Sequence, residues 1–256
     1  MDKRKFIFGL ALFSALIIVF TFNAGLSSVD MPSALEPFSS QHPLGTDTFG
    51  RDILSRLSLG ALISIALAFI ITIISTSAGL VLSFFMDERN LLSSVAWFFS
   101  DSIKSLGSVI LALFLSSVFS PGFAVIIVSI SLSQIPSIAR TSYSRLVIVR
   151  NEEFVTYAES EGMGKLAIAM RHLIPHVMGE VSSQALGVFS SSILTESALS
   201  FLGTGIPVLY PSLGSMMNEG RTLMLSRPSL VVIPALTLFL ITLSLNLMYE
   251  ASESYS

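Results

Sequence analysis

Long apolar stretches with almost no charge are the feature that most constrains this chain. The clearest of them runs from residue 60 to residue 86 and contains no charged side chain. As a helix with a rise of ~1.5 Å per residue, it would be roughly 40 Å long. A tilted helix of that length crosses a bilayer core of about 30 Å. The chain is therefore expected to be built from membrane-spanning helices.

Six such segments predict an all-α membrane protein with six transmembrane helices. Their approximate bounds are 6–22, 60–86, 91–119, 123–142, 177–201 and 228–249. The first segment follows a basic start, as in a signal peptide, but its length favours an uncleaved helix. Between the second and third segments, residues 87–90 are expected to form a tight polar turn.

Composition agrees with lipid as the main solvent. Charged residues make up 12% of the chain, whereas soluble domains carry about 25%. The net charge of −3 is too small to indicate a nucleic acid partner. The absence of cysteine excludes disulfides and thiolate metal sites.

The distribution of Lys and Arg between the connecting segments predicts the orientation. With the N-terminus in the cytoplasm, that side receives nine of these residues and the opposite side receives four. The nine are Lys3, Arg4, Lys5, Arg89, Arg140, Arg145, Arg150, Lys165 and Arg171, and the four are Arg51, Arg56, Arg221 and Arg227. Both termini and the charged segment near residue 160 are therefore expected in the cytoplasm.

That charged segment, residues 149–177, lies between two apolar spans and predicts two short helices. Acidic residues at the start of 152–161 favour a helix there through the helix dipole. Its apolar residues recur at helical spacing, and Gly162 is placed to end it. A second helix is expected from Lys165 to Pro175, with Leu166, Ala169, Met170 and Leu173 along one face. From the residues alone, two interpretations of this amphipathic pair remain equally open. It would either lie on the membrane or pack on its own bundle, or it would dock on a partner protein.

The same segment resembles the cytoplasmic EAA loop of ABC-importer permeases. That loop has a Gly after its first helix and a Pro thirteen residues later, as Gly162 and Pro175 stand here. The EAA triplet itself is degenerate and reads Thr156-Tyr157-Ala158. The resemblance implies that this loop docks on an ATPase subunit. The residues expected to carry the coupling are Glu153, Tyr157, Ala158, Gly162 and Pro175.

Two further stretches resemble the C-type permeases of dipeptide, oligopeptide and nickel importers. Residues 44–60, LGTDTFGRDILSRLSLG, are similar to that family's signature between its first two spans. Residues 193–221, ILTESALSFLGTGIPVLYPSLGSMMNEGR, are similar to a second conserved pattern of the family. They depart from it at Leu213, where the family usually has Trp, and at Leu209-Tyr210, where it tends to have Pro.

The resemblance implies a type I ABC importer permease fold in a bacterial cytoplasmic (inner) membrane. Residues 1–58 would form the first helix and an extracytoplasmic linker, residues 59–250 the permease core with coupling loop 144–176, and residues 251–256 a short tail. The implied partners are a second, related permease, two ABC ATPases and an extracytoplasmic binding protein. The implied substrates are di- or oligopeptides or chelated nickel. Closure of the two ATPase subunits, driven by ATP, would move residues 152–175 as a lever.

No enzyme activity or cofactor is expected in the chain itself. It contains no GxxxxGK[ST] phosphate loop, so ATP and Mg²⁺ are expected on the ATPase subunits. His172 and His176 have a spacing that suits zinc, but Pro175 interrupts the helix between them and no Glu follows the first His. No metal site is expected.

Charged and small residues inside the apolar spans are candidates for the substrate pathway or its gate, because ionisable groups there are costly. The candidates are Asp101, Ser192, Glu196, Gly203 and Gly205. We expect Asp101 to pair with Lys104, three residues later on the same helix face. Glu196 has no local cation in its serine-rich span, and those serines would either line a wet pathway or pack helices closely.

Residues 203–227 are expected to dip towards the pathway mouth as a gate. Two alternatives stay open. The first is a secondary transporter driven by an ion gradient, with Glu196 and Asp101 as its coupling carboxylates. The second is a non-transporting assembly or anchor subunit.

Overall fold

The computed structural model describes residues 3–25, 28–86, 91–120, 122–207 and 209–253. The predicted turn at residues 87–90 and the last three residues of the tail lie outside these ranges. Within them the regular structure is helical, apart from one isolated antiparallel bridge between Thr46 and Asp52. The predicted all-α class is therefore confirmed.

Ten α-helices and three short helical turns are described. The helices are α1 (Lys3–Asn23), α2 (Ile53–Met86), α3 (Leu91–Leu106), α4 (Ser108–Val118), α5 (Phe123–Arg150), α6 (Glu153–Ser160), α7 (Lys165–Ile168), α8 (Ile174–Phe201), α9 (Leu213–Gly220) and α10 (Ser229–Glu253). Two short 3₁₀ turns, η1 (Met31–Ser33) and η3 (Arg221–Leu223), and one π turn, η2 (Ala169–Leu173), connect them.

All six predicted spans are helical, but the third is not one straight helix. Four helices, α1, α2, α5 and α10, are each long and apolar enough to cross a membrane. α8 has 28 residues and is long enough, although its serines make it less apolar. The predicted single span 91–119 is instead the pair α3 and α4, bent by 88°. The break falls at Gly107, whose φ of +71° is one that residues with a Cβ seldom adopt.

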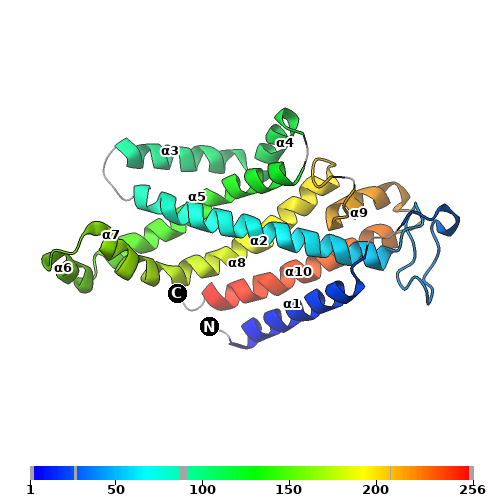
Figure 1. The fold of residues 1–256 in the computed structure, drawn as a ribbon, viewed down its shortest axis with the longest axis horizontal. Coiled ribbons are helices and arrows are strands. Elements are labelled where there is room, and N and C mark those ends of the chain that lie inside the picture. Colours follow the sequence, from blue (N-terminus) through cyan, green and yellow to red (C-terminus); the bar gives the residue numbers. More distant parts are fainter. Residues whose placement is uncertain (1–2, 26–27, 87–90, 121, 208, 254–256) are drawn as a thin grey trace.

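The long helices run along the molecule and separate its two ends (Figure 1). Both termini, α6 and α7 lie at one end, and the segment between α1 and α2 lies with α9 at the other. At the terminal end, the Lys5 ammonium pairs with the Glu250 carboxylate at 3.3 Å. The chain therefore places its charged loop on the same side as its two ends.

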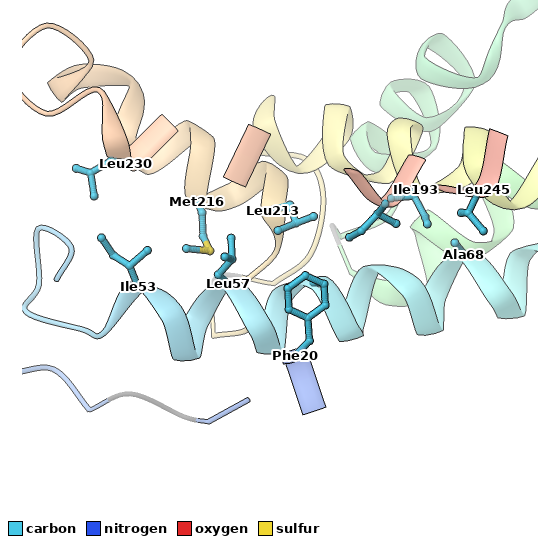
Figure 2. Packing of buried hydrophobic residues seen from close by; sticks show 11 residues of the cluster. Phe20, Ile53, Leu57, Ala68, Ile193, Leu213, Met216, Leu230 and Leu245 are labelled. Carbon is cyan, nitrogen blue, oxygen red and sulfur yellow. The ribbon is translucent and has the colours of Figure 1, made fainter. Parts of the chain in front are cut away.

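The main hydrophobic core holds the half of the bundle nearest α9 together. Figure 2 shows Leu57 on α2 facing Leu213 and Met216 of α9, with Phe20 of α1 beside them. All of these side chains are at most 5% exposed. Outside the core, α2 presents apolar residues to its surroundings, since Phe69 and Ile73 are 57% and 54% exposed. A surface of this kind suits lipid.

Candidate functional site

The charged loop, residues 152–175, is a folded element rather than a free connection; we call it the charged hairpin. Val155 and Ala158 of α6 are 2% and 4% exposed and belong to a hydrophobic cluster of their own. That cluster also takes Leu146 from α5 and Val177 from α8. The predicted apolar face of the first helix is thus confirmed, and it packs on the protein's own bundle.

Gly162 ends α6 by a Schellman motif. Its φ is +79°, the left-handed conformation that glycine adopts at least cost. The Gly162 N–H donates to the Glu159 carbonyl at 3.0 Å, and the Met163 N–H donates to the Ala158 carbonyl at 3.2 Å. No atom lies within 4 Å of where a Cβ of Gly162 would be, so the backbone conformation alone selects glycine here.

The second helix of the charged hairpin does not stop at Pro175, which corrects the sequence prediction. α7 passes through the π turn η2 into α8, and Pro175 lies in the first turn of α8. Pro175 has no N–H to donate, and the helix passes it through a π turn, in which the Ile174 N–H donates to the Ala169 carbonyl. Leu173 is buried, whereas Met170, predicted on the same face, is 61% exposed.

Aromatic contacts fix the charged hairpin to the start of α8. The Phe154 ring stacks on His176 at a centroid distance of 4.9 Å and lies 5.9 Å from His172. The His176 Nδ1 is 2.7 Å from the His172 carbonyl oxygen. The two histidines therefore take part in packing and backbone bonding.

The outer face of the charged hairpin is what a partner would meet. Tyr157 is 65% exposed, and Glu153 at the start of α6 is also exposed. Ala158, by contrast, is buried in the cluster. It would therefore affect coupling only by holding α6 in place, and not by touching a partner. The predicted coupling residues thus divide into exposed ones and ones that shape the element.

The opposite end of the molecule holds an ion cluster that sequence reasoning missed. The Arg56 guanidinium, 5% exposed, donates to both oxygens of Glu219 at 2.8 and 2.9 Å, and to Asp47. Arg51 bridges the same two carboxylates, at 2.8 Å to Asp47 and 2.9 Å to Glu219. Arg56 is therefore buried inside the protein, where the two carboxylates compensate its charge.

This ion cluster joins the two motif stretches at residues 44–60 and 193–221. Asp47 also accepts the backbone N–H groups of Phe49 and Arg51, which shapes the turn before α2. Gly60 lets the start of α9 approach, since an added Cβ would lie 3.1 Å from the Ser212 Cα. A signal was present in the sequence, because both motifs contain charged residues close to apolar spans.

Glu196 lies completely buried between α2, α8 and α9. Its carboxylate accepts hydrogen bonds from Ser64 at 2.6 Å and Ser200 at 2.7 Å, with Ser197 at 3.4 Å. Ser192 is likewise 0% exposed. Glu196 and Ser192 are therefore enclosed by packed helices within this chain, and a role for them in the pathway stays a prediction.

Gly203 and Gly205 form the turn after α8. The Gly203 N–H donates to the Ser200 carbonyl at 3.1 Å, which ends the helix. An added Cβ on Gly205 would lie 2.1 Å from the Ser200 Oγ, so this turn closes tightly over the Glu196 site. The following α9 packs on α8 and α10. A gating role for these residues stays a prediction.

Asp101 has a different partner from the one expected. Its carboxylate pairs with Arg140 of α5 rather than with Lys104, three residues along its own helix. The Arg140 guanidinium also lies over the Trp97 ring, 5.6 Å from its centroid. Asp101 is exposed, unlike Glu196, so only one of the two carboxylates proposed for ion coupling reaches the surface of this chain.

Comparison with known proteins gives this arrangement a context. Residues 75–254 match the family described as binding-protein-dependent transport system inner membrane component. The chain belongs to this family. As a binding-protein-dependent transport permease, it is a multi-pass component of the inner membrane. The family implies ATPase and binding-protein partners.

The curated proteins to which this permease is similar are named as permease proteins of transport systems. It is 28% identical to the dipeptide transport system permease protein DppC of Alkalihalophilus pseudofirmus, over 96% of this chain and 84% of that protein. It is 32% identical to the glutathione transport system permease protein GsiD of Escherichia coli, over 82% and 70%. It resembles the C-type permeases of peptide importers, and the ion-gradient alternative finds no support among these relatives.

Solved structures confirm the fold of the permease. The methionine ABC transporter MetNI, in inward-facing conformations, matches with a TM-score of 0.60 over 77% of this chain and 96% of that chain, at 16% identity. An amino acid ABC transporter crystallised with histidines matches with a TM-score of 0.61. The type I importer permease fold expected from the sequence is therefore present.

Proposed function

We propose that this permease forms, with a second and related permease subunit, the membrane pathway of an importer for short peptides. The names of its relatives support peptides over chelated nickel, since they include dipeptide, di/tripeptide and glutathione systems. In this proposal, two ATPases bind ATP and Mg²⁺ below the pathway, and a binding protein delivers the peptide from above. The chain itself catalyses no reaction.

The observation that carries the proposal is the construction of the charged hairpin. It is packed rigidly on the ends of α5 and α8 by its own hydrophobic cluster, while Tyr157 and Glu153 point outward. A rigid element with an exposed face transmits a push from a partner into the two helices that hold it. It lies at the end of the bundle that carries both termini (Figure 1), which is the end proposed to be cytoplasmic.

The test is peptide uptake by the complete complex in proteoliposomes. Tyr157→Ala removes an exposed contact without touching the cluster, so we expect ATP-driven uptake of a labelled dipeptide to fall at least tenfold. Tyr157→Phe keeps the ring and is the matched control. Gly162→Pro, which cannot adopt φ +79°, should abolish uptake while the chain still inserts into the membrane.

Two results would contradict the proposal. The first is uptake by Tyr157→Ala at the wild-type rate. The second is uptake that proceeds without ATP when an ion gradient alone is imposed.

A further inference from the structure

One side of α5 carries a row of polar residues. A side of the helix that faced lipid would carry apolar residues at these positions. Ser133, Ser137, Arg140 and Ser144 recur at spacings of four, three and four, and so share one face of the helix. All of them are half-buried or exposed in this chain. The face of α2 around Phe69 and Ile73, which is 57% and 54% exposed at these residues, is apolar instead.

Neighbouring helices add polar partners on both sides of this face. From α8, Gln184 donates to the Ser137 hydroxyl at 3.0 Å, and Ser191 accepts from Gln134 at 3.0 Å. Also on α8, Glu180 lies 3.6 Å from the Arg145 Nε. From α3, Asp101 pairs with Arg140. We call these paired residues of α3, α5 and α8, together with Ser133 and Ser144 on the same side of α5, the polar lane.

The polar lane lies within the length of the helices and not only at their ends. Arg145 and Gln134 are eleven residues apart, about 16 Å along α5 at ~1.5 Å per residue. Arg140 stands ten residues before the end of α5 at Arg150, about 15 Å. The predicted span 123–142 thus contains Gln134, Ser137 and Arg140, with Arg140 near its cytoplasmic end and Arg145 just beyond it.

The ion pairs of the polar lane are not sealed inside the bundle. The side chains of Arg140 and Asp101 are 33% and 63% exposed, and those of Arg145 and Glu180 are 36% and 34% exposed. Ionisable side chains within a membrane span are costly against lipid and face a water-filled cavity or a partner instead. In the Arg56 cluster, by contrast, the Arg56 and Asp47 side chains are only 6% and 7% exposed.

The geometry points to the polar lane as the wall of the water-filled pathway, where it contacts a zwitterionic short peptide in transit. This inference rests on the proposed function and assigns the substrate-facing surface within it. Each ion pair offers one charge of each sign at a half-exposed position. The ammonium end of a peptide is attracted to Asp101 or Glu180, and its carboxylate end to Arg140 or Arg145. Both signs along one face match a ligand with both signs at its ends.

Thiol labelling of the complete complex in proteoliposomes tests this inference, because the chain has no cysteine of its own. Ser133→Cys introduces a thiol in the polar lane, where the native hydroxyl bonds only its own helix backbone. Ser77→Cys is the matched control, an exposed serine on α2 whose hydroxyl also bonds only its own helix. Ser133 lies ten residues from the nearer end of its helix and Ser77 nine residues, so depth does not favour Ser133.

We expect a charged, water-soluble methanethiosulfonate reagent to modify Ser133→Cys at least tenfold faster than Ser77→Cys. An unblocked dipeptide at millimolar concentration should slow that reaction, and the same dipeptide acetylated and amidated should not. Equal rates at the two positions overturn the pathway assignment and indicate lipid or a dry contact with the second permease. Fast labelling that both dipeptides slow equally, or that neither slows, overturns the assignment of a zwitterion.

Uptake by the unsubstituted complex separates this inference from the proposed function. ATP-driven dipeptide uptake with no preferential labelling at Ser133→Cys overturns the polar lane alone. Fast, dipeptide-protected labelling without ATP-driven uptake supports the polar lane and overturns the coupling to ATP.

Discussion

Arg56 lies buried at the start of α2, with its guanidinium between the carboxylates of Asp47 and Glu219. Asp47 precedes α2 and Glu219 ends α9, so one side chain connects two regions that are far apart in the sequence. A buried charge is stable only while its partners remain, and removing one member leaves the others uncompensated. Arg56 is therefore a position where a single substitution should act on the whole end of the bundle.

We expect Arg56→Met to lower the free energy of unfolding by about 3 kcal/mol, since it leaves two carboxylates with only Arg51 as a cation. Thermal unfolding of the purified permease in detergent measures the effect. Lys5→Met is the matched control, because the Lys5–Glu250 pair is 51% and 59% exposed and such pairs contribute about 0–1 kcal/mol. Equal shifts for the two variants would refute the assignment of a stabilising role to the buried cluster.

Glu196 illustrates the same principle without a cation. Three serine hydroxyls, from Ser64, Ser197 and Ser200, surround its carboxylate. Short polar side chains let α2 and α8 approach closely and satisfy the buried oxygens at the same time. Of the serines on its own helix, Ser197 and Ser200 donate to its carboxylate.

The charged hairpin is the element whose parts have separable roles. Val155 is 2% exposed and belongs to the cluster beneath α6, whereas Tyr157 faces outward. The buried residues should determine how stably α6 packs on the bundle. The exposed residues should determine its contacts with a partner subunit. One substitution at each position distinguishes the two.

We expect Val155→Ala to destabilise the packing of α6 by about 2 kcal/mol, from the loss of two buried methyl groups at ~0.8 kcal/mol each plus a small cavity. The backbone amides of residues 153–163 should then exchange hydrogen faster, as followed by mass spectrometry. Tyr157→Ala should leave that exchange unchanged and reduce only ATP-driven uptake. If Tyr157→Ala accelerates exchange as much as Val155→Ala does, the division between packing and contact is wrong.

At the scale of the molecule, the two ends of the bundle are expected on opposite sides of the membrane. Tyr157 of the charged hairpin and Phe38 in the segment before α2 are both 65% exposed. The charged hairpin and the segment before α2 lie at opposite ends of the bundle (Figure 1). The count of basic residues in the connecting segments predicts that Tyr157 is cytoplasmic. This prediction concerns the orientation of the whole chain.

An impermeant maleimide should label Phe38→Cys in intact cells and Tyr157→Cys only in inverted vesicles. The native chain contains no cysteine, so each label reports one site. Labelling of Tyr157→Cys from outside the cell would reverse the orientation and remove the basis for ATPase docking. Labelling of both sites from the same side would contradict the arrangement of the bundle.

The sequence by itself determined the local features of this protein. Apolar runs located all six helical spans, and the stripe of Val155 and Ala158 identified the buried face of α6. Gly162 marked the end of that helix. These features depend on periodicity, side-chain size and turn conformation, which act between residues close in the chain.

Only the tertiary structure decided which polar residues meet. Arg56 and Glu219 are 163 positions apart, and Ser64 and Glu196 are 132 apart. Asp101 pairs with Arg140 of α5, and not with Lys104 of its own helix, because α3 packs beside α5. The physical reason is that helix propensity is local, whereas the partner of a charge depends on which helices the hydrophobic core brings together.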